Sequence, residues 1–223
     1  MNMHNVNIVA RYEAKLLRRD IVFLGFVVLA MVGISLWQMI IQGGNNVFWY
    51  KVALSSSFPF FSTYYYNLVQ VLIALFVCME VVYRERKKDA MEVFLCRPLR
   101  NSEYCIGRFW GIFRMFLFVN ICVLLVCMYL NIWVVGSPFE VWVYVFYLLT
   151  LSIPTLIFAL GCSLGISEIV RNRPVSVLVL GMLGLGVYFY LGEWQFGVFD
   201  FWGRNLPNMF SDVTGHPDLY GYL

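Results

Sequence analysis

The chain has 223 residues, of which 61% are hydrophobic and only 13% are charged, and its formal net charge is +3. An average soluble domain carries roughly 25% charged residues, which coat its surface. This chain lacks that coat, so its composition argues against a soluble fold and favours a membrane protein, whose lipid-facing surface needs no charge. The length fits a single domain.

An amphipathic helix is predicted over residues 4–20. Apolar side chains recur there at helical spacing with basic side chains between them, which suits a helix lying along the inner membrane surface. The apolar positions are Val6, Val9, Tyr12, Leu16 and Leu17, and the basic positions are Arg11, Lys15, Arg18 and Arg19.

Five apolar stretches without Asp, Glu, Lys or Arg are long enough to cross a membrane, because ~30 Å of hydrocarbon takes ~20 helical residues. The sequence therefore predicts an all-α integral membrane bundle of five transmembrane helices. After trimming, the spans are expected near 21–41, 61–82, 109–132, 141–166 and 175–192.

The distribution of Lys and Arg predicts the orientation of these spans. When the five spans alternate across the membrane, all of the 16 Lys and Arg residues except Lys51 and Arg204 fall on one side. That side is expected to be the cytoplasm, which places the N-terminus inside a plasma membrane of the bacterial inner-membrane type. The tail 193–223 then lies outside, as an outer-surface or re-entrant segment.

Several chemical functions lack their motifs. The chain has no Gly-x-x-x-x-Gly-Lys-Ser/Thr phosphate loop, so it is not expected to bind and hydrolyse ATP itself. It has no His-Glu-x-x-His motif, and its two histidines, His4 and His216, are far apart, so no metal site is expected. No Ser/His/Asp set can be assembled within the membrane, and an enzyme is disfavoured.

A few polar residues interrupt the predicted spans. Asn67 and Gln70 are three residues apart on the second span and so share a face, and Asn120 lies in the third. In the fourth span, Pro154 is surrounded by Thr150, Ser152 and Thr155. They are candidates for a polar lining of a substrate path. The alternative is hydrogen bonding between helices, worth ~0.6–2 kcal/mol for each bond.

Small residues and one proline predict local features of the bundle. Gly107-x-x-x-Gly111 and Gly161-x-x-x-Gly165 allow close approach between helices, and packing is the preferred interpretation of both. Pro154 is expected to kink the fourth span, with Thr155 near enough to satisfy a freed carbonyl group.

The charged connection between the second and third spans contains a second amphipathic piece. Ala90, Met91, Phe94 and Leu95 form a narrow apolar stripe, and Pro98 ends the helix. A solvated loop that only fixes topology needs no such stripe, whereas an apolar stripe on a cytoplasmic helix needs a protein or lipid surface to cover it.

This connection resembles the first cytoplasmic loop in the permease subunits of ABC-2 type transporters. The match spans residues 85–108, and Asp-Ala stands where Gly-Thr is commoner in that family. The matching residues are Glu85-Arg86, Asp89-Ala90, Glu92, Arg97-Pro98, Asn101, Glu103-Tyr104, Gly107 and Arg108.

The resemblance implies that 4–20 is an elbow helix and that 84–98 holds a coupling helix resting on a separate ATP-binding subunit. That subunit would use ATP and Mg²⁺, and this chain would bind no cofactor. The residues expected to dock on the subunit are Glu85, Arg86, Asp89, Met91, Glu92, Phe94, Leu95 and Pro98.

The resemblance also implies that 193–223 begins the outer segment that precedes a sixth span in this family. The chain thus looks like the N-terminal portion of a longer permease of the copper-maturation and gliding-type branch. Its expected function is that of an exporter subunit, with a second permease copy or homologous half and membrane lipid as partners, and no nucleic acid. The alternative is a non-transport membrane scaffold or assembly protein whose basic loop binds a soluble partner or anionic lipid.

Overall fold

The computed structural model describes residues 3–43, 57–85, 100–135, 139–170 and 172–186, and these residues are almost entirely helical. Two π-helical turns, Asn131–Val135 and Leu148–Ser152, extend α5 and join α6 to α7. The helices are α1 (Met3–Leu17), α2 (Ile21–Gly43), α3 (Ser57–Glu85), α5 (Asn101–Leu130), α6 (Val141–Tyr147), α7 (Ile153–Ile169) and α8 (Arg173–Gly186).

Three helical segments are long and apolar enough to cross a membrane: Phe58–Tyr83, Asn101–Trp133 and Val141–Ile169. Shorter apolar helices cover Ile21–Gly33 and Pro174–Gly186. The predicted all-helical class is confirmed for the described part of the chain. The count of five spans stays a prediction.

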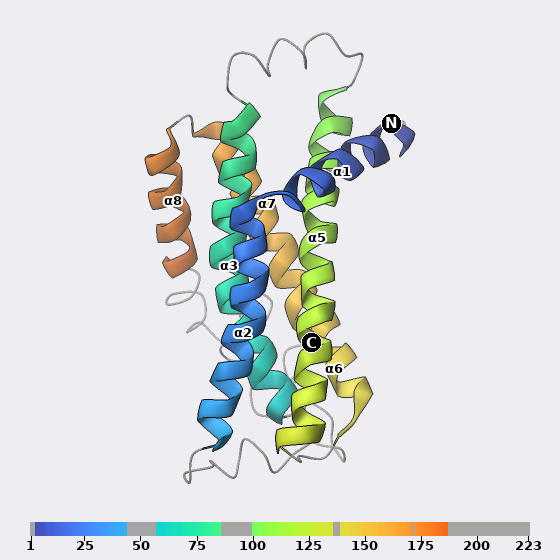
Figure 1. The fold of residues 1–223 in the computed structure, drawn as a ribbon. Coiled ribbons are helices and arrows are strands. Elements are labelled where there is room, and N and C mark those ends of the chain that lie inside the picture. Colours follow the sequence, from blue (N-terminus) through green and yellow to red (C-terminus); the bar gives the residue numbers. More distant parts are fainter. Residues whose placement is uncertain (1–2, 44–56, 86–99, 136–138, 171, 187–223) are drawn as a thin grey trace, which may run out of the picture.

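The apolar core lies between α2, α3, α5 and α7, which run along a common axis (Figure 1). Phe116 of α5 packs against Phe23 and Phe26 of α2, with ring centroids 5.5 and 5.8 Å apart. The outer faces are apolar as well, since Phe118 and Met182 are 62% and 72% exposed. An apolar exterior of this kind suits a lipid environment.

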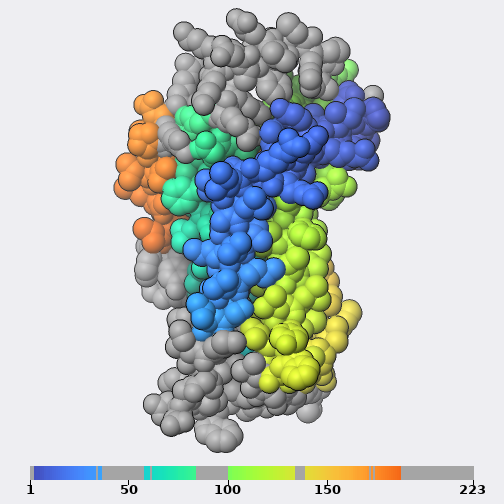
Figure 2. All heavy atoms as spheres, in the orientation of Figure 1, coloured from blue at the N-terminus to red at the C-terminus, as the bar shows by residue number. Residues whose placement is uncertain are grey.

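Helix α1 crosses the bundle, whereas the other helices run along it (Figure 1). Figure 2 shows α1 lying over α5 on the surface of the molecule. The two glycines of the first small-residue motif form the contact on α5. A Cβ atom added to Gly107 would lie 2.7 Å from Val9 Cβ, and one added to Gly111 would lie 2.7 Å from the Ala10 carbonyl oxygen.

In the described part of the chain, no other helix packs closely against the second small-residue motif, Gly161-x-x-x-Gly165. A Cβ atom at Gly161 or Gly165 would meet no described atom within 4 Å outside the backbone of its own helix. The prediction of close packing is therefore right for Gly107 and Gly111. For Gly161 and Gly165 it stays a prediction.

The helix around Pro154 carries the predicted irregularity. Proline has no N–H to continue the helical ladder, and the π-helical turn Leu148–Ser152 lies just before it. The Thr155 hydroxyl donates to the Leu151 carbonyl oxygen at 2.7 Å. This is a hydrogen bond to the carbonyl group four residues earlier, and the carbonyl group that Pro154 itself leaves without its helical donor is that of Thr150, so the predicted compensation stays a prediction.

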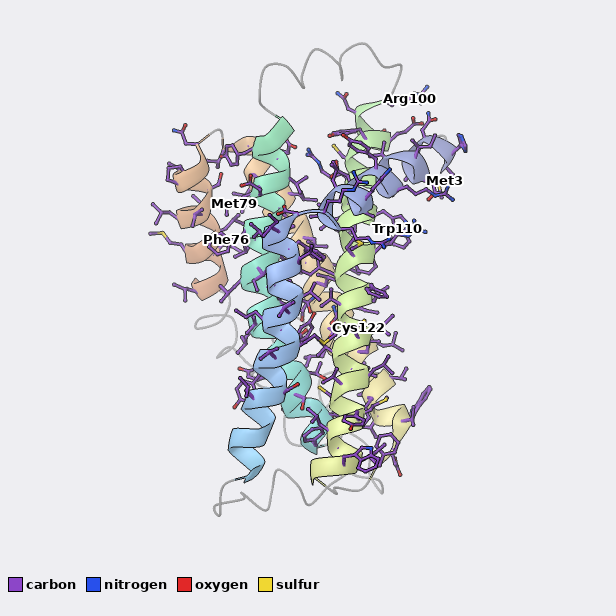
Figure 3. All side chains as sticks on the ribbon, in the orientation of Figure 1. Met3, Phe76, Met79, Arg100, Trp110 and Cys122 are labelled. Atoms are coloured by element: carbon purple, nitrogen blue, oxygen red, sulfur yellow. The ribbon has the colours of Figure 1, made fainter. Side chains whose placement is uncertain are left out.

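One end of the bundle, termed here the α1 end, gathers several helix termini. Helix α3 ends and α5 begins there, beside α1 (Figure 1). Figure 3 places Met3, Arg100 and Trp110 at this end. The predicted coupling helix 84–98, apart from the last two residues of α3, and the tail 193–223 lie outside the described residues.

Candidate functional site

A polar stripe runs along the buried side of α3, which is otherwise apolar enough to span a membrane. Ser62, Tyr66 and Gln70 follow one another at intervals of four residues, and Thr63 and Asn67 directly follow the first two. All five residues therefore share one side of the helix. None of them is exposed. The stripe consists of Ser62, Thr63, Tyr66, Asn67 and Gln70.

Three side chains of the stripe carry polar atoms without a hydrogen-bond partner among the described residues. Tyr66, Asn67 and Gln70 are at most 2% exposed. The Tyr66 hydroxyl and both polar atoms of each carboxamide reach no partner there. Each such group costs ~1–3 kcal/mol when it is buried unsatisfied. Polar groups left in this state are available to water, to a ligand or to another chain.

A small cavity, with room for about one or two water molecules, lies beside Tyr66 in the half of the bundle away from α1. It is enclosed by α3, α5, α6 and the π-helical turn that follows α6. The polar part of the wall consists of Ser62, Thr63, Tyr66, Asn120, Tyr144 and Ser152, and the rest of Pro59, Val123, Leu124, Cys127 and Leu148. The described residues of the wall thus offer hydroxyls and one carboxamide, and none of them is Asp, Glu, Lys or Arg.

The three residues predicted for a substrate path divide between two places. Asn120 lines the cavity, and its Nδ2 atom donates to the Phe116 carbonyl oxygen of its own helix at 2.8 Å. Asn67 and Gln70 are buried on the same stripe as Tyr66 but do not line the cavity. Their role in a substrate path stays a prediction.

Sequence reasoning missed most of the cavity wall. Tyr66 lies near the end of a predicted span, where a tyrosine usually reaches the membrane surface, whereas it is only 2% exposed and lines the cavity. The signal that identifies it is the i, i+4, i+8 spacing of Ser62, Tyr66 and Gln70. Ser152 is one of the polar residues singled out in the fourth predicted span, and it lines the cavity. Tyr144 follows α5 by a connection, and no local pattern places it opposite α3.

A further polar pair lies near the cavity. Asn131, at the first π-helical turn, is fully buried and donates from Nδ2 to the Tyr144 hydroxyl at 2.9 Å. This hydrogen bond joins the end of α5 to α6, so Tyr144 is held in place on one wall of the cavity.

Ionic groups gather instead at the α1 end. Arg108 of α5 is 3% exposed, and its Nη1 atom lies 2.7 Å from Oε1 of Glu168 on α7. The guanidinium group also lies over the Tyr104 ring, 5.1 Å from its centroid. A buried cation is tolerated in an apolar bundle only when it is paired in this way.

Two more contacts join neighbouring elements at this end. Asn5 of α1 donates from Nδ2 to Oε2 of Glu103 at 3.1 Å, and Glu103 is only 4% exposed. The Tyr83 hydroxyl at the end of α3 donates to the Val170 carbonyl oxygen at 3.1 Å and lies 3.1 Å from the Ser176 hydroxyl. The α1 end is therefore cross-linked by polar contacts between five helices.

The residues expected to dock on an ATP-binding subunit cannot be placed in this geometry. Glu85 is the last residue of α3. Arg86, Asp89, Met91, Glu92, Phe94, Leu95 and Pro98 lie outside the described residues. Their docking role stays a prediction from the sequence.

Comparison with known proteins yields no relative: no protein-family model, no curated protein and no solved structure matches the chain.

Proposed function

We propose that the chain is the membrane-spanning permease subunit of an ABC-2 type transporter, acting as an exporter. In this proposal the N-terminus and the 84–98 segment lie in the cytoplasm of a cell whose plasma membrane the chain crosses five times. ATP is hydrolysed by a separate subunit, and a second permease copy or homologous half completes the path.

One observation carries the proposal: an amphipathic helix is packed across the α1 end of α5. It lies at the end of the bundle where α3 ends and α5 begins, and the connection that contains 84–98 joins these two helix ends. The sequence resemblance predicts this arrangement, in which an elbow helix and a coupling segment lie at the same end of the bundle. The contact is close because Gly107 and Gly111 have no side chains to hold α1 away.

The charges of α1 support a cytoplasmic position for this end. Arg11, Lys15, Arg18 and Arg19 are exposed, together with the apolar side chains of Ile8 and Tyr12. Basic and apolar side chains on one exposed surface suit the headgroup region of the inner leaflet.

The interior of the bundle supports transport. A path for a solute needs polar groups that are not already used by the helices, and Tyr66, Asn67 and Gln70 supply them. ATP-driven closure of two docked subunits would move α3 and α5 through the 84–98 segment and change access to these groups.

Copurification tests the proposal. The chain should copurify with an ATP-hydrolysing subunit, and Glu85→Lys or Glu92→Lys should remove that subunit or abolish its ATPase stimulation. Glu140→Lys is the matched control, because Glu140 is exposed and precedes α6 at the far end of the bundle.

Two results would contradict the proposal. One is a complex and an ATPase rate that are indifferent to the changes at Glu85 and Glu92. The other is binding that depends on Lys87 and Lys88 and disappears with added salt, which is the behaviour of a lipid-binding or scaffolding loop.

A further inference from the structure

The apolar side of α1 is buried against α5. Val6 and Val9 are only 6% and 7% exposed. Cβ atoms added to Gly107 and Gly111 would lie 2.7 Å from Val9 Cβ and from the Ala10 carbonyl oxygen, so the two helices touch along this side. An amphipathic helix that is free of protein inserts its apolar side into a membrane. In this structure that side is already covered, and α1 meets its surroundings through the opposite face.

The opposite face, termed here the basic face, is strongly cationic. Its members follow one another at intervals of three or four residues, as 8, 11, 15 and 18 and as 8, 12, 15 and 19, so they lie on one side of the helix and of the turn after it. All of them are exposed. The basic face consists of Ile8, Arg11, Tyr12, Lys15, Arg18 and Arg19.

The acidic residues of this segment do not neutralise the basic face. Glu13 is 1% exposed, and its Cβ atom lies on the side of α1 that faces Gly111. Oδ1 of Asp20 accepts a hydrogen bond from the Val22 N–H at 2.9 Å, at the start of α2. Within residues 3–20, therefore, four exposed positive charges face outward and no acidic side chain is exposed beside them.

Two residues of α5 extend the basic face. Arg114 is exposed, and its Nη1 atom donates to Oδ1 of Asn7 on α1 at 3.3 Å. The guanidinium group lies over the Trp110 ring, 5.5 Å from its centroid. Trp110 is 43% exposed at the α1 end, where Figure 3 labels it. A partly exposed tryptophan beside a cation is typical of the level of the lipid head groups.

Apolar surface begins directly beside the basic face. Helix α2 starts at Ile21, after the turn that holds Arg18 and Arg19, and Ile21 and Val22 are 84% and 62% exposed. Figure 2 shows α1 and α2 on the same side of the molecule. A soluble polyanion would leave these apolar side chains uncovered. A phospholipid offers a phosphate to the cations and acyl chains to the apolar side chains, so it suits both surfaces.

We propose that the basic face, together with Arg114 and Trp110, binds the head groups of anionic phospholipids, and that this binding stabilises the folded chain. A ligand that binds only the folded state stabilises it by mass action. Zwitterionic lipids carry a positive group next to the phosphate, so they bind this cationic surface more weakly. The inference goes beyond the proposed function, because it needs neither ATP nor a second subunit.

Native mass spectrometry of the full chain in detergent tests the inference. Phosphatidylglycerol and phosphatidylcholine with the same acyl chains are titrated separately, and the dissociation constant of the first bound lipid is measured. Phosphatidylglycerol should bind several-fold more tightly, and a higher salt concentration should reduce this preference because salt screens exposed charges. Phosphatidylglycerol should also raise the unfolding temperature more than phosphatidylcholine does.

Arg11→Gln combined with Lys15→Gln is the decisive variant. Both side chains are exposed, and glutamine is nearly as good a helix former as arginine or lysine, so α1 should stay folded. Each basic side chain near an anionic lipid surface contributes about fivefold to binding, so the double variant should bind phosphatidylglycerol more than about tenfold more weakly. Its unfolding temperature without added lipid should equal that of the unchanged protein.

Lys87→Gln combined with Lys88→Gln is the matched control. It removes the same charge from the connection between α3 and α5 and leaves the basic face intact. Its affinity for phosphatidylglycerol should match that of the unchanged protein.

Three results would each overturn the inference. Equal affinities for the two lipids would remove the preference for anionic head groups. An equal loss in the two double variants would show that only the net charge attracts the lipid. Competition by glycerol phosphate at the concentration of the lipid would make the basic face a site for small soluble anions.

The outcome is independent of the copurification experiment. Selective lipid binding without an ATPase partner would leave the basic face as a lipid site and remove the transporter. An ATPase partner without selective lipid binding would do the reverse.

Discussion

Arg108 on α5 and Glu168 on α7 form an ion pair with 2.7 Å between Nη1 and Oε1. The two partners differ in environment, because the Arg108 side chain is 3% exposed and that of Glu168 is 51% exposed. The pair therefore neutralises a cation inside the bundle with an anion at its edge. It also ties two of the three long apolar helices together at the α1 end.

Glu168→Gln should destabilise the protein. The change removes the counter-charge and leaves the buried guanidinium of Arg108 with a neutral acceptor. Since Glu168 is half exposed, solvent weakens the pair, and we expect a loss of about 1–3 kcal/mol in the free energy of unfolding. Thermal unfolding of the detergent-solubilised protein, followed by circular dichroism, measures the effect.

Glu140→Gln is the control for this prediction, because Glu140 is exposed and caps α6 without a side-chain hydrogen bond. Its unfolding temperature should match that of the unchanged protein. A similar decrease in both variants would show that the ion pair is not the source of the stability.

Gly107→Ala should loosen α1 from α5. The new Cβ atom would lie 2.7 Å from Val9 Cβ and 2.9 Å from the Val6 carbonyl oxygen, so backbone or side chain must move. Trypsin should then cut more quickly after Arg11 and Lys15, which are exposed on α1. The rate of cleavage, read by mass spectrometry, measures the detachment.

Gly161→Ala is the paired control, because no described atom outside the backbone of its own helix lies within 4 Å of the position of its Cβ. Alanine favours helix over glycine by about 1 kcal/mol, so stability should stay constant or rise. Equal cleavage rates in the two variants would mean that close packing at Gly107 does not hold α1.

The two small-residue motifs show how far the sequence predicts the fold. Gly107-x-x-x-Gly111 and Gly161-x-x-x-Gly165 are alike as patterns, but only the first receives a helix within the described residues. Its partner, α1, lies about a hundred residues earlier in the chain. The spacing of residues within α5 therefore does not predict that α1 packs against it. Apolar length alone, by contrast, predicts the all-helical class and the three long apolar helices of the described residues, since a segment in lipid must satisfy its own backbone groups.

The candidate site was predictable to a similar degree. Asn67, Gln70 and Asn120 stand out in the sequence because carboxamides are costly in hydrocarbon, and all three are buried. Tyr66 did not stand out, since a tyrosine near the end of a span usually reaches the membrane surface. Which residues face a cavity depends on how α3, α5 and α6 pack, and that information is not local.

Gln70→Met should raise the stability of the isolated bundle. The Gln70 carboxamide is fully buried and reaches no partner among the described residues, and methionine has a similar length without the polar atoms. Removing an unsatisfied group of this kind should add up to about 1–3 kcal/mol to the free energy of unfolding. The unfolding temperature in detergent measures it.

Asn131→Leu gives the opposite result and serves as the comparison. Asn131 is equally buried, but it donates to the Tyr144 hydroxyl, so leucine leaves that hydroxyl without its partner and the unfolding temperature should fall. A decrease for Gln70→Met as well would mean that its carboxamide is satisfied in solution by water or by another chain.

Cys105 should react with reagents only from the cytoplasmic side. It is exposed in the first turns of α5, at the α1 end that the excess of Lys and Arg assigns to the cytoplasm. In a variant that keeps Cys105 and replaces the other five of the six cysteines with alanine, a membrane-impermeant maleimide should label inverted vesicles and spare intact spheroplasts. Permeabilised spheroplasts provide the control for reactivity of the thiol. Labelling of intact spheroplasts would place α1 and the 84–98 segment outside the cell, where no ATP-hydrolysing subunit can reach them.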